Sequence, residues 1–256
     1  MSKLSYIDSF DGQPLAIHRM GQGGAKGGPV ILLHGLFSSA HMNWISFGTA
    51  EILAQAGFDV IMPDLRAHGE SAKPHDPASY PSDVLVRDVF AVADGFGLEA
   101  GEFDLAGFSL GARTAASAVI AGLEPRRLAL CGMGLEGLAG WAQRSGFFID
   151  AIDRFDQVKQ GDPAYLAVSF MKQMKVDRIA ARLLLQAVDD VRRADLANIT
   201  MPAAVICGEK DRDNGSPQDL AQALPDGQYR EIPGTHMSCV TKPELGETIR
   251  DFLANG

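Results

Sequence analysis

Short apolar runs alternate with longer amphipathic segments along most of this chain. The strand-like runs lie at 30–33, 58–62, 103–106, 127–131, 203–207 and 228–232, and all but the last are mainly apolar. The segments between them repeat apolar positions at helical spacing and lie at 49–55, 81–93, 112–121, 218–223 and 245–253. This order predicts a parallel sheet covered by helices.

The first residues follow a different pattern. Two strand-like segments, 4–7 and 14–19, flank the pair Asp11-Gly12, which is typical of a tight turn. We therefore expect two antiparallel strands to begin the sheet. The predicted fold class is α/β, with an eight-stranded, mostly parallel sheet flanked by helices.

The alternation breaks between residues 134 and 197, where helical stripes occur without a convincing strand. The clearest stripe comprises Val176, Ile179, Ala180, Leu183, Ala187, Val188 and Val191. We interpret 134–197 as an inserted helical cap. The core is then expected to consist of 1–133 and 198–256.

Composition narrows the classes of function. The chain has 256 residues, of which 46% are hydrophobic and 21% charged, so it can bury a large core. Its net charge of −9 argues against a nucleic acid or an anionic membrane as partner, because both require a basic face. Without a leader-like segment or an apolar run near the roughly 20 residues of a membrane span, we expect a cytoplasmic protein.

The run Gly107-Phe108-Ser109-Leu110-Gly111 has the pattern GxSxG and lies between an expected strand and an expected helix. Glycine on both sides of Ser109 permits a sharp turn that β-carbons would obstruct. The helix that begins at Leu110 would direct free N–H groups toward the serine oxygen. Ser109 is therefore a candidate nucleophile, although serine is also a common helix N-cap.

A serine nucleophile requires a base and a carboxylate that orients the base. His236 follows the last expected strand, and Asp211 directly follows the strand at 203–207. The order Ser, Asp, His is the one expected for a nucleophile at such a turn. Asp213 and Glu136 remain alternatives to Asp211.

An oxyanion intermediate would need backbone N–H donors beside Ser109. One donor is expected from Leu110 and the other from the loop after His34-Gly35, at either Leu36 or Phe37. His34 itself is interpreted as a structural hydrogen-bonding residue, because His236 already serves as the base.

The segments LLHGLFSS, MPDLRAHGES, AGFSLGAR, ICGEKDR and PGTHM resemble those of the α/β-hydrolase fold superfamily across nearly the whole chain. The resemblance implies a Ser109, Asp211 and His236 triad and leaves the substrate open. It also implies that His68 is a brace in the loop after the fourth strand. This chain has Ala67 where the family usually has glycine.

Two further patterns bear on cofactors. Residues 132–137 satisfy GxGxxG after a strand, but they do not begin a βαβ unit, so we expect a flexible entry to the cap and no dinucleotide. The six histidines lack paired ligand spacing, so no metal is expected either.

Candidate substrate contacts are Arg113, Trp141 and Phe148. Arg113 lies one helical turn beyond Ser109, as in some related lyases of menaquinone biosynthesis that hold a carboxylated substrate, although an ion pair with a nearby carboxylate is the simpler explanation. The many bulky apolar residues of the cap indicate a small-molecule substrate with an apolar part.

These features predict a serine hydrolase that cleaves a small ester, thioester or lactone through an acyl-enzyme. Two alternatives stay open, a cofactor-free carbon–carbon bond hydrolase or lyase with the same triad, and a non-catalytic small-molecule receptor. The sequence does not determine the oligomeric state.

Overall fold

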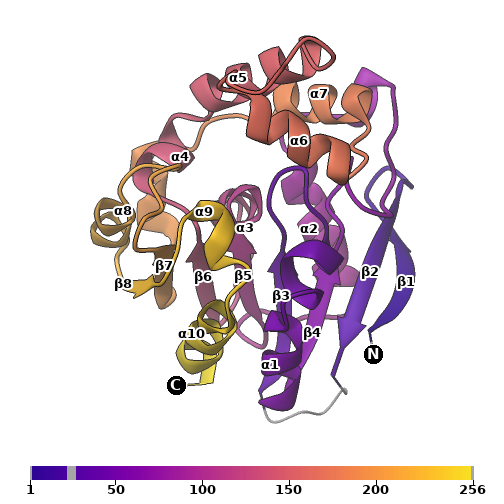
Figure 1. Ribbon diagram of the computed structural model, residues 1–256. Coiled ribbons are helices and arrows are strands. Elements are labelled where there is room, and N and C mark those ends of the chain that lie inside the picture. Colours follow the sequence, from indigo (N-terminus) through magenta and orange to yellow (C-terminus); the bar gives the residue numbers. More distant parts are fainter. Residues whose placement is uncertain (1, 22–26, 255–256) are drawn as a thin grey trace.

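The computed structural model of the protein describes residues 2–21 and 27–254, which form one eight-stranded sheet in the order β1-β2-β4-β3-β5-β6-β7-β8 (Figure 1). The strands are β1 (Lys3–Asp8), β2 (Pro14–Met20), β3 (Gly28–Leu33), β4 (Phe58–Pro63), β5 (Asp104–Phe108), β6 (Arg127–Cys131), β7 (Ala203–Gly208) and β8 (Gly227–Ile232). β2 pairs antiparallel with β1 and β4, and every other pairing is parallel. The predicted fold class is confirmed.

Helices cover both faces of the sheet, which explains why its inner strands are mainly apolar. All residues of β4, β5 and β7 are buried. One face packs against α1 (Thr49–Gln55) and α10 (Pro243–Ala254), through Leu53 and Phe252 among others. The other face packs against α2 (Val84–Gly95), α3 (Leu110–Ile120) and α8 (Pro217–Ala223).

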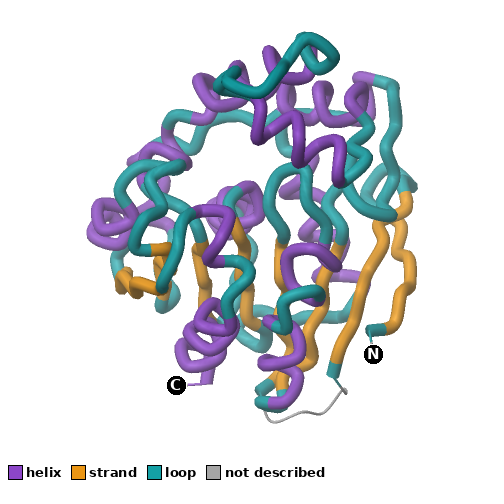
Figure 2. Tube along the Cα trace, viewed as in Figure 1, coloured by secondary structure: helices purple, strands orange, loops and turns teal. Residues whose placement is uncertain are grey.

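Between β6 and β7 the chain forms α4 (Leu135–Ala139), α5 (Trp141–Asp153), α6 (Tyr165–Gln173) and α7 (Arg178–Ala187), followed by the 3₁₀ helix η3 (Arg193–Asn198). Figure 2 shows only helices and loops in this part of the molecule, above the sheet edge at which β5 leads into α3. These helices make up the predicted cap, while the exact division of the chain into core and cap stays a prediction.

The longest predicted stripe of the cap is only partly helical. Asp177 accepts hydrogen bonds from the amides of Ile179 and Ala180, so it caps α7 and excludes Val176 from the helix. At the other end Val188 is extended, and the Val191 amide donates to the Leu138 carbonyl instead of continuing the helix. The predicted stripe therefore extends beyond both ends of α7. Val176, Val188 and Val191 are apolar because they pack on the core, and they are not helical.

Within the ranges that the structure describes, no helix has the length and apolarity needed to cross a membrane.

Candidate active site

Ser109 occupies the turn between β5 and α3, with φ 53° and ψ −111°. Glycine is needed on both sides of it. A β-carbon on Gly107 would lie 2.2 Å from the Gly111 carbonyl oxygen, and one on Gly111 would lie 2.0 Å from the Leu33 carbonyl oxygen. The motif therefore reflects backbone crowding, which presents the Ser109 hydroxyl at the edge of the sheet.

Three side chains form one line of hydrogen bonds at this edge. His236 Nε2 lies 3.1 Å from Ser109 Oγ, and His236 Nδ1 lies 2.8 Å from Asp211 Oδ2. The pairing fixes the tautomer, because an Nδ1–H that donates to the carboxylate leaves Nε2 free to accept the serine proton. The structure thus brings together the three residues that the sequence selected.

The two alternative carboxylates lie elsewhere. The Asp213 amide donates to Asp211 Oδ1 at 3.1 Å, so the backbone of Asp213 supports Asp211. Glu136 Oε2 accepts a hydrogen bond from the Ser216 amide at 2.8 Å and thereby fixes the loop after β7.

The surroundings keep Asp211 ionised. Burial alone would raise its pKa, but the hydrogen bond and charge of His236, the Asp213 amide and the nearby Arg144 lower it overall. His236 is the first residue of the short helix α9 (His236–Cys239). A reciprocal cap between Thr235 and Ser238 holds this turn.

The ring of His236 is also confined by packing. The Phe108 ring lies 5.0 Å from it between centroids. On the Gly132 side, an added β-carbon would come within 2.7 Å of Phe108 and 3.2 Å of His236.

Close packing also explains the other two glycines of the GxGxxG pattern at 132–137, which are Gly134 and Gly137. A β-carbon on Gly134 would lie 2.5 Å from the Asn214 carbonyl oxygen, and one on Gly137 would lie 2.6 Å from Met133 Sδ. Asn214 Nδ2 in turn donates to the Gly132 carbonyl at 2.7 Å. The glycines let this segment approach the loop that carries Asp211.

The loop after β3 lies beside the start of α3, and one of its amides is already engaged. The Phe37 amide donates to His68 Nε2 at 3.0 Å, which removes it from the two candidates for the second oxyanion donor. The Gly35 amide donates to Asn43 Oδ1 at 3.0 Å. Leu36 lies between these two anchored residues, so its amide is the better candidate to act with that of Leu110.

Two neutral histidines brace this loop, which is the role predicted for His34 and the one that the resemblance implies for His68. His34 donates from Nδ1 to the Gly35 carbonyl and accepts at Nε2 from the Leu65 amide. His68 donates from Nδ1 to the Arg66 carbonyl and accepts from Phe37. Burial lowers the pKa of His34 and lowers that of His68 to about 3, so both rings act as uncharged acceptors.

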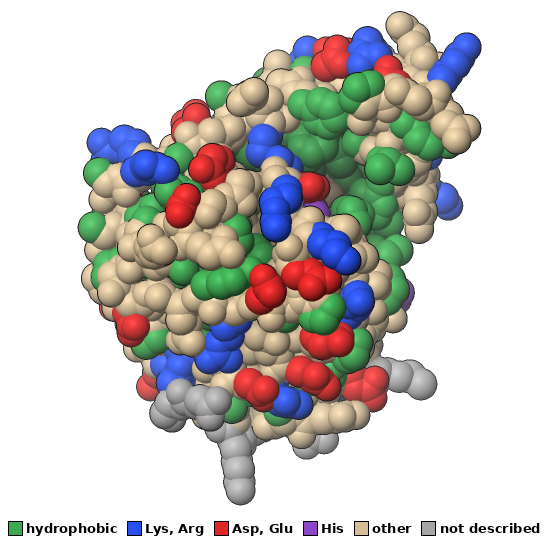
Figure 3. Space-filling model, turned by 60° about the vertical axis from the view of Figure 1, so that its left-hand side comes forward, with side chains coloured by type: hydrophobic (Ala, Val, Ile, Leu, Met, Phe, Trp, Pro, Cys, Tyr) green, Lys and Arg blue, Asp and Glu red, His purple; other side chains and the backbone are tan. Residues whose placement is uncertain are grey.

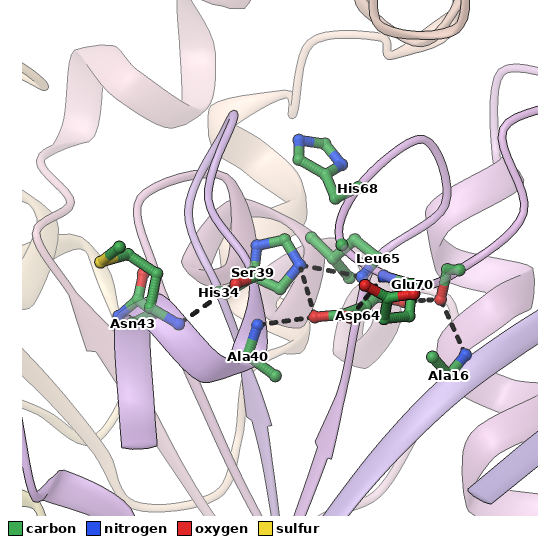
Figure 4. A network of polar contacts seen from close by, with 12 residues as sticks. Ala16, His34, Ser39, Ala40, Asn43, Asp64, Leu65, His68 and Glu70 are labelled. Atoms are coloured by element: carbon green, nitrogen blue, oxygen red, sulfur yellow. Dashed lines mark hydrogen bonds and ion pairs between the residues drawn. The ribbon is translucent and has the colours of Figure 1, made fainter. Parts of the chain in front are cut away.

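A buried carboxylate extends the brace (Figure 4). Asp64 accepts from the Ala40 amide at 2.7 Å and from the Glu70 amide at 2.8 Å, joining the loop after β3 to the loop after β4. Burial would raise the pKa of Asp64, but the side chain of His18 and the two amides hold it well below its usual range. The carboxylate is therefore a permanent acceptor beneath the site.

Arg113 occupies a position that differs from the predicted one. Its Nη1 donates to the carbonyls of Gly137 at 3.2 Å and Leu138 at 2.5 Å, and its Nη2 donates to the Asp189 carbonyl. The guanidinium thus joins α3 to both ends of the cap. These carbonyl contacts account for most of its Nη donors, and a contact with substrate stays a prediction.

The two predicted aromatic contacts have different surroundings. Trp141 is buried at the base of the cap, where its ring lies 5.1 Å from the Arg113 guanidinium, so its contacts are structural. Phe148 is partly buried and packs edge-on against Phe37, with 5.5 Å between ring centroids. Of the two, Phe148 is the one placed over the candidate oxyanion loop.

A hollow lies beneath the cap. Figure 3 shows it lined mainly by hydrophobic side chains, with a histidine at its inner end and Lys or Arg side chains along one rim. Such a hollow can hold an apolar molecule while keeping bulk water away from the polar groups beneath it.

Several side chains of the site were not selected from the sequence. Asn43 fixes Gly35 from the π-helical segment η1 (His41–Ile45), and Asn214 fixes Gly132. Arg144 reaches from the cap to the Asp213 carbonyl. Their only sequence signal is proximity to a predicted site loop, which many polar residues share.

Comparison with known proteins agrees with the observed fold. Residues 28–129 match the sequence model of the alpha/beta hydrolase fold family. No curated protein sequence matches the chain.

Many solved structures share the fold. An enol-lactonase from Burkholderia xenovorans LB400 is 22% identical, with a TM-score of 0.75 over 98% of this chain and 100% of its own. A hydrolase from Pseudomonas aeruginosa PA01 is 22% identical, with a TM-score of 0.75 over 98% of each chain. An esterase from Rhodococcus sp. ECU1013 is 21% identical, with a TM-score of 0.74 over 98% of each chain.

Proposed function

We propose, on the premise that this chain belongs to the α/β-hydrolase fold superfamily, that it is a serine hydrolase of a small ester, thioester or lactone. The observation that carries the proposal is the continuous chain of hydrogen bonds from Asp211 through His236 to Ser109. The hollow beneath the cap, with its apolar lining, is the expected place for the acyl or alcohol part of the substrate.

In the first step, Ser109 Oγ forms a bond to the substrate carbonyl carbon while its proton passes to His236 Nε2. Asp211 stabilises the resulting imidazolium through Nδ1. The carbonyl oxygen becomes an oxyanion that accepts hydrogen bonds from the amides of Leu110 and Leu36. One such donor typically contributes about 2.7–4 kcal/mol to transition-state stabilisation.

Collapse of the oxyanion breaks the bond between the carbonyl carbon and the leaving group, which receives the proton from His236 Nε2. The acyl group then remains on Ser109 Oγ. A water molecule gives its proton to Nε2 as its oxygen attacks the acyl carbon, and Ser109 leaves with that proton. The products are a carboxylic acid and an alcohol or thiol, or a hydroxy acid from a lactone.

A fluorophosphonate probe tests this assignment because it phosphonylates an activated serine. We expect the folded protein to be labelled at Ser109 and the Ser109→Ala variant to be unlabelled. Hydrolysis of a 4-nitrophenyl ester should fall by about 10⁴-fold or more, as is typical when a triad nucleophile is removed.

Ser117→Ala, on the same helix α3, is the matched control and should keep both labelling and turnover. Labelling that persists in Ser109→Ala, or a wild-type protein that is neither labelled nor active, would contradict the proposal. Turnover of a vinylogous diketone without turnover of esters would instead assign carbon–carbon bond cleavage to the same triad.

A further inference from the structure

One cap arginine, Arg144, lies next to the candidate site and forms no ion pair in the part of the chain that the structure describes. Arg154, Arg178, Arg182 and Arg192 each form an ion pair with an aspartate. Arg144, on α5, donates from Nη1 to the backbone carbonyl of Asp213, and no carboxylate in the described ranges forms an ion pair with it. It is partly buried, as Arg154 and Arg182 also are, whereas Arg178 and Arg192 are exposed.

Arg144 lies between the two sides of the candidate site. Its guanidinium is 5.9 Å from the centre of the Phe148 ring, and Phe148 packs against Phe37 in the loop that contains Leu36. On the other side, Asp213 is two residues beyond the triad carboxylate Asp211. The cation is thus held near the acid of the triad by a carbonyl and an aromatic face.

This placement leaves part of the hydrogen-bonding capacity of Arg144 unused within the described part of the chain. Burial disfavours the cation and lowers the pKa of Arg144 overall, although the charges of Asp213 and Asp211 oppose that shift. A guanidinium has five N–H donors in one plane, and the Asp213 carbonyl uses part of that set. A carboxylate could accept two parallel hydrogen bonds from the remaining donors.

We propose that Arg144 binds a carboxylate on the acyl part of the substrate, so that the protein prefers half-esters or half-thioesters of dicarboxylic acids. This inference rests on the proposed hydrolase function. The scissile carbonyl would lie at Ser109, the apolar middle of the acyl chain in the hollow, and its far carboxylate at Arg144. Lys or Arg side chains along the rim of the hollow are consistent with a negatively charged substrate (Figure 3).

A pair of matched esters measures this preference directly. One is the mono-4-nitrophenyl ester of glutaric acid, and the other is the same compound with its free carboxylate methylated. We expect the wild-type protein to have the higher kcat/KM on the free acid. Arg144→Gln should reduce the ratio of the two kcat/KM values by about 10- to 100-fold, as expected for loss of a charge-assisted contact.

Arg144→Lys should keep part of the ratio, because an ammonium retains the charge without the planar pair of donors. Arg182→Gln is the control, since Arg182 is a cap arginine that pairs with Asp153, and it should leave the ratio unchanged. A ratio that stays the same in Arg144→Gln overturns the inference. So does an equal loss on both esters with a shifted acid limb of the pH profile, because Arg144 would then act through Asp211.

Binding separates this inference from the proposed function. In the Ser109→Ala background, calorimetry with monoethyl glutarate and diethyl glutarate should show tighter binding of the acid, and Arg144→Gln should remove the difference. If the wild-type protein hydrolyses no ester but this difference holds, the anion site stands and the hydrolase proposal fails. If no difference in binding is found, the anion site is overturned.

Discussion

Three residues with side chains hold positive φ angles beside the site, Phe37 at 60°, Ala67 at 68° and Ser109 at 53°. A β-carbon makes this region costly, and glycine is the usual occupant. At Ser109 this conformational cost is offset by function, because the residue must carry the hydroxyl. At Ala67 no such reason is visible, because the methyl group is simply buried in the loop that carries His68.

We therefore expect Ala67→Gly to relieve local strain. The free energy of unfolding should rise by up to about 1 kcal/mol, since removing the β-carbon penalty at positive φ outweighs the added freedom of the unfolded chain. Urea denaturation measures the change. The control is Ala91→Gly in the middle of α2, which should lose about 0.5–1 kcal/mol, and an equal loss at Ala67 would refute the strain argument.

At the scale of elements, the junction of β5 with α3 is limited by backbone crowding. α3 approaches β3 so closely that Gly111 has no room for a β-carbon against the Leu33 carbonyl. This contact positions both the nucleophile and the N-terminal amides of α3. It ties the conformation of the turn to the position of the whole helix.

Gly111→Ala should therefore be severely destabilising. The obstacle is backbone, which moves only if α3 shifts away from the sheet, so we expect a loss of about 3 kcal/mol or more in the free energy of unfolding. Gly146→Ala in α5 is the matched control, with nothing within 4 Å of its added β-carbon. There the thermal midpoint should rise slightly, and similar outcomes at the two glycines would contradict the crowding argument.

At the scale of the whole molecule, the buried brace makes stability depend on pH. The folded chain protonates His68 only near its lowered pKa of about 3, whereas the unfolded chain does so near 6.5. Between these values the unfolded state binds more protons, so stability falls as the pH drops from 6.5 toward 3. His34, whose pKa is also lowered by burial, adds to the same trend.

Urea titrations at several pH values between 7.5 and 4.5 measure this slope. Each proton taken up only by the unfolded chain contributes about 1.4 kcal/mol per pH unit. His68→Gln keeps an acceptor for the Phe37 amide but removes one titrating group. Its slope should be smaller by about one proton, and a slope equal to that of the wild type would contradict the neutral-brace interpretation.

The sequence predicted the sheet well, because strands buried on both faces leave short, mainly apolar runs. The triad residues could be selected because each follows directly on a strand or turn. The ends of α7 were misplaced, since Val188 and Val191 are apolar for packing alone. The contacts of Arg113 could not be read from the chain, because Asp189 lies 76 residues away in sequence.

Arg113 joins both connections of the cap to one point. The carbonyls of Gly137 and Leu138 belong to the outgoing segment, and that of Asp189 belongs to the returning one. Since all three meet a side chain one turn from Ser109, the two connections of the cap are fastened to α3 at one place beside the nucleophile. We therefore expect any opening of the cap to displace the end farthest from Arg113 most and the backbone beside the serine least.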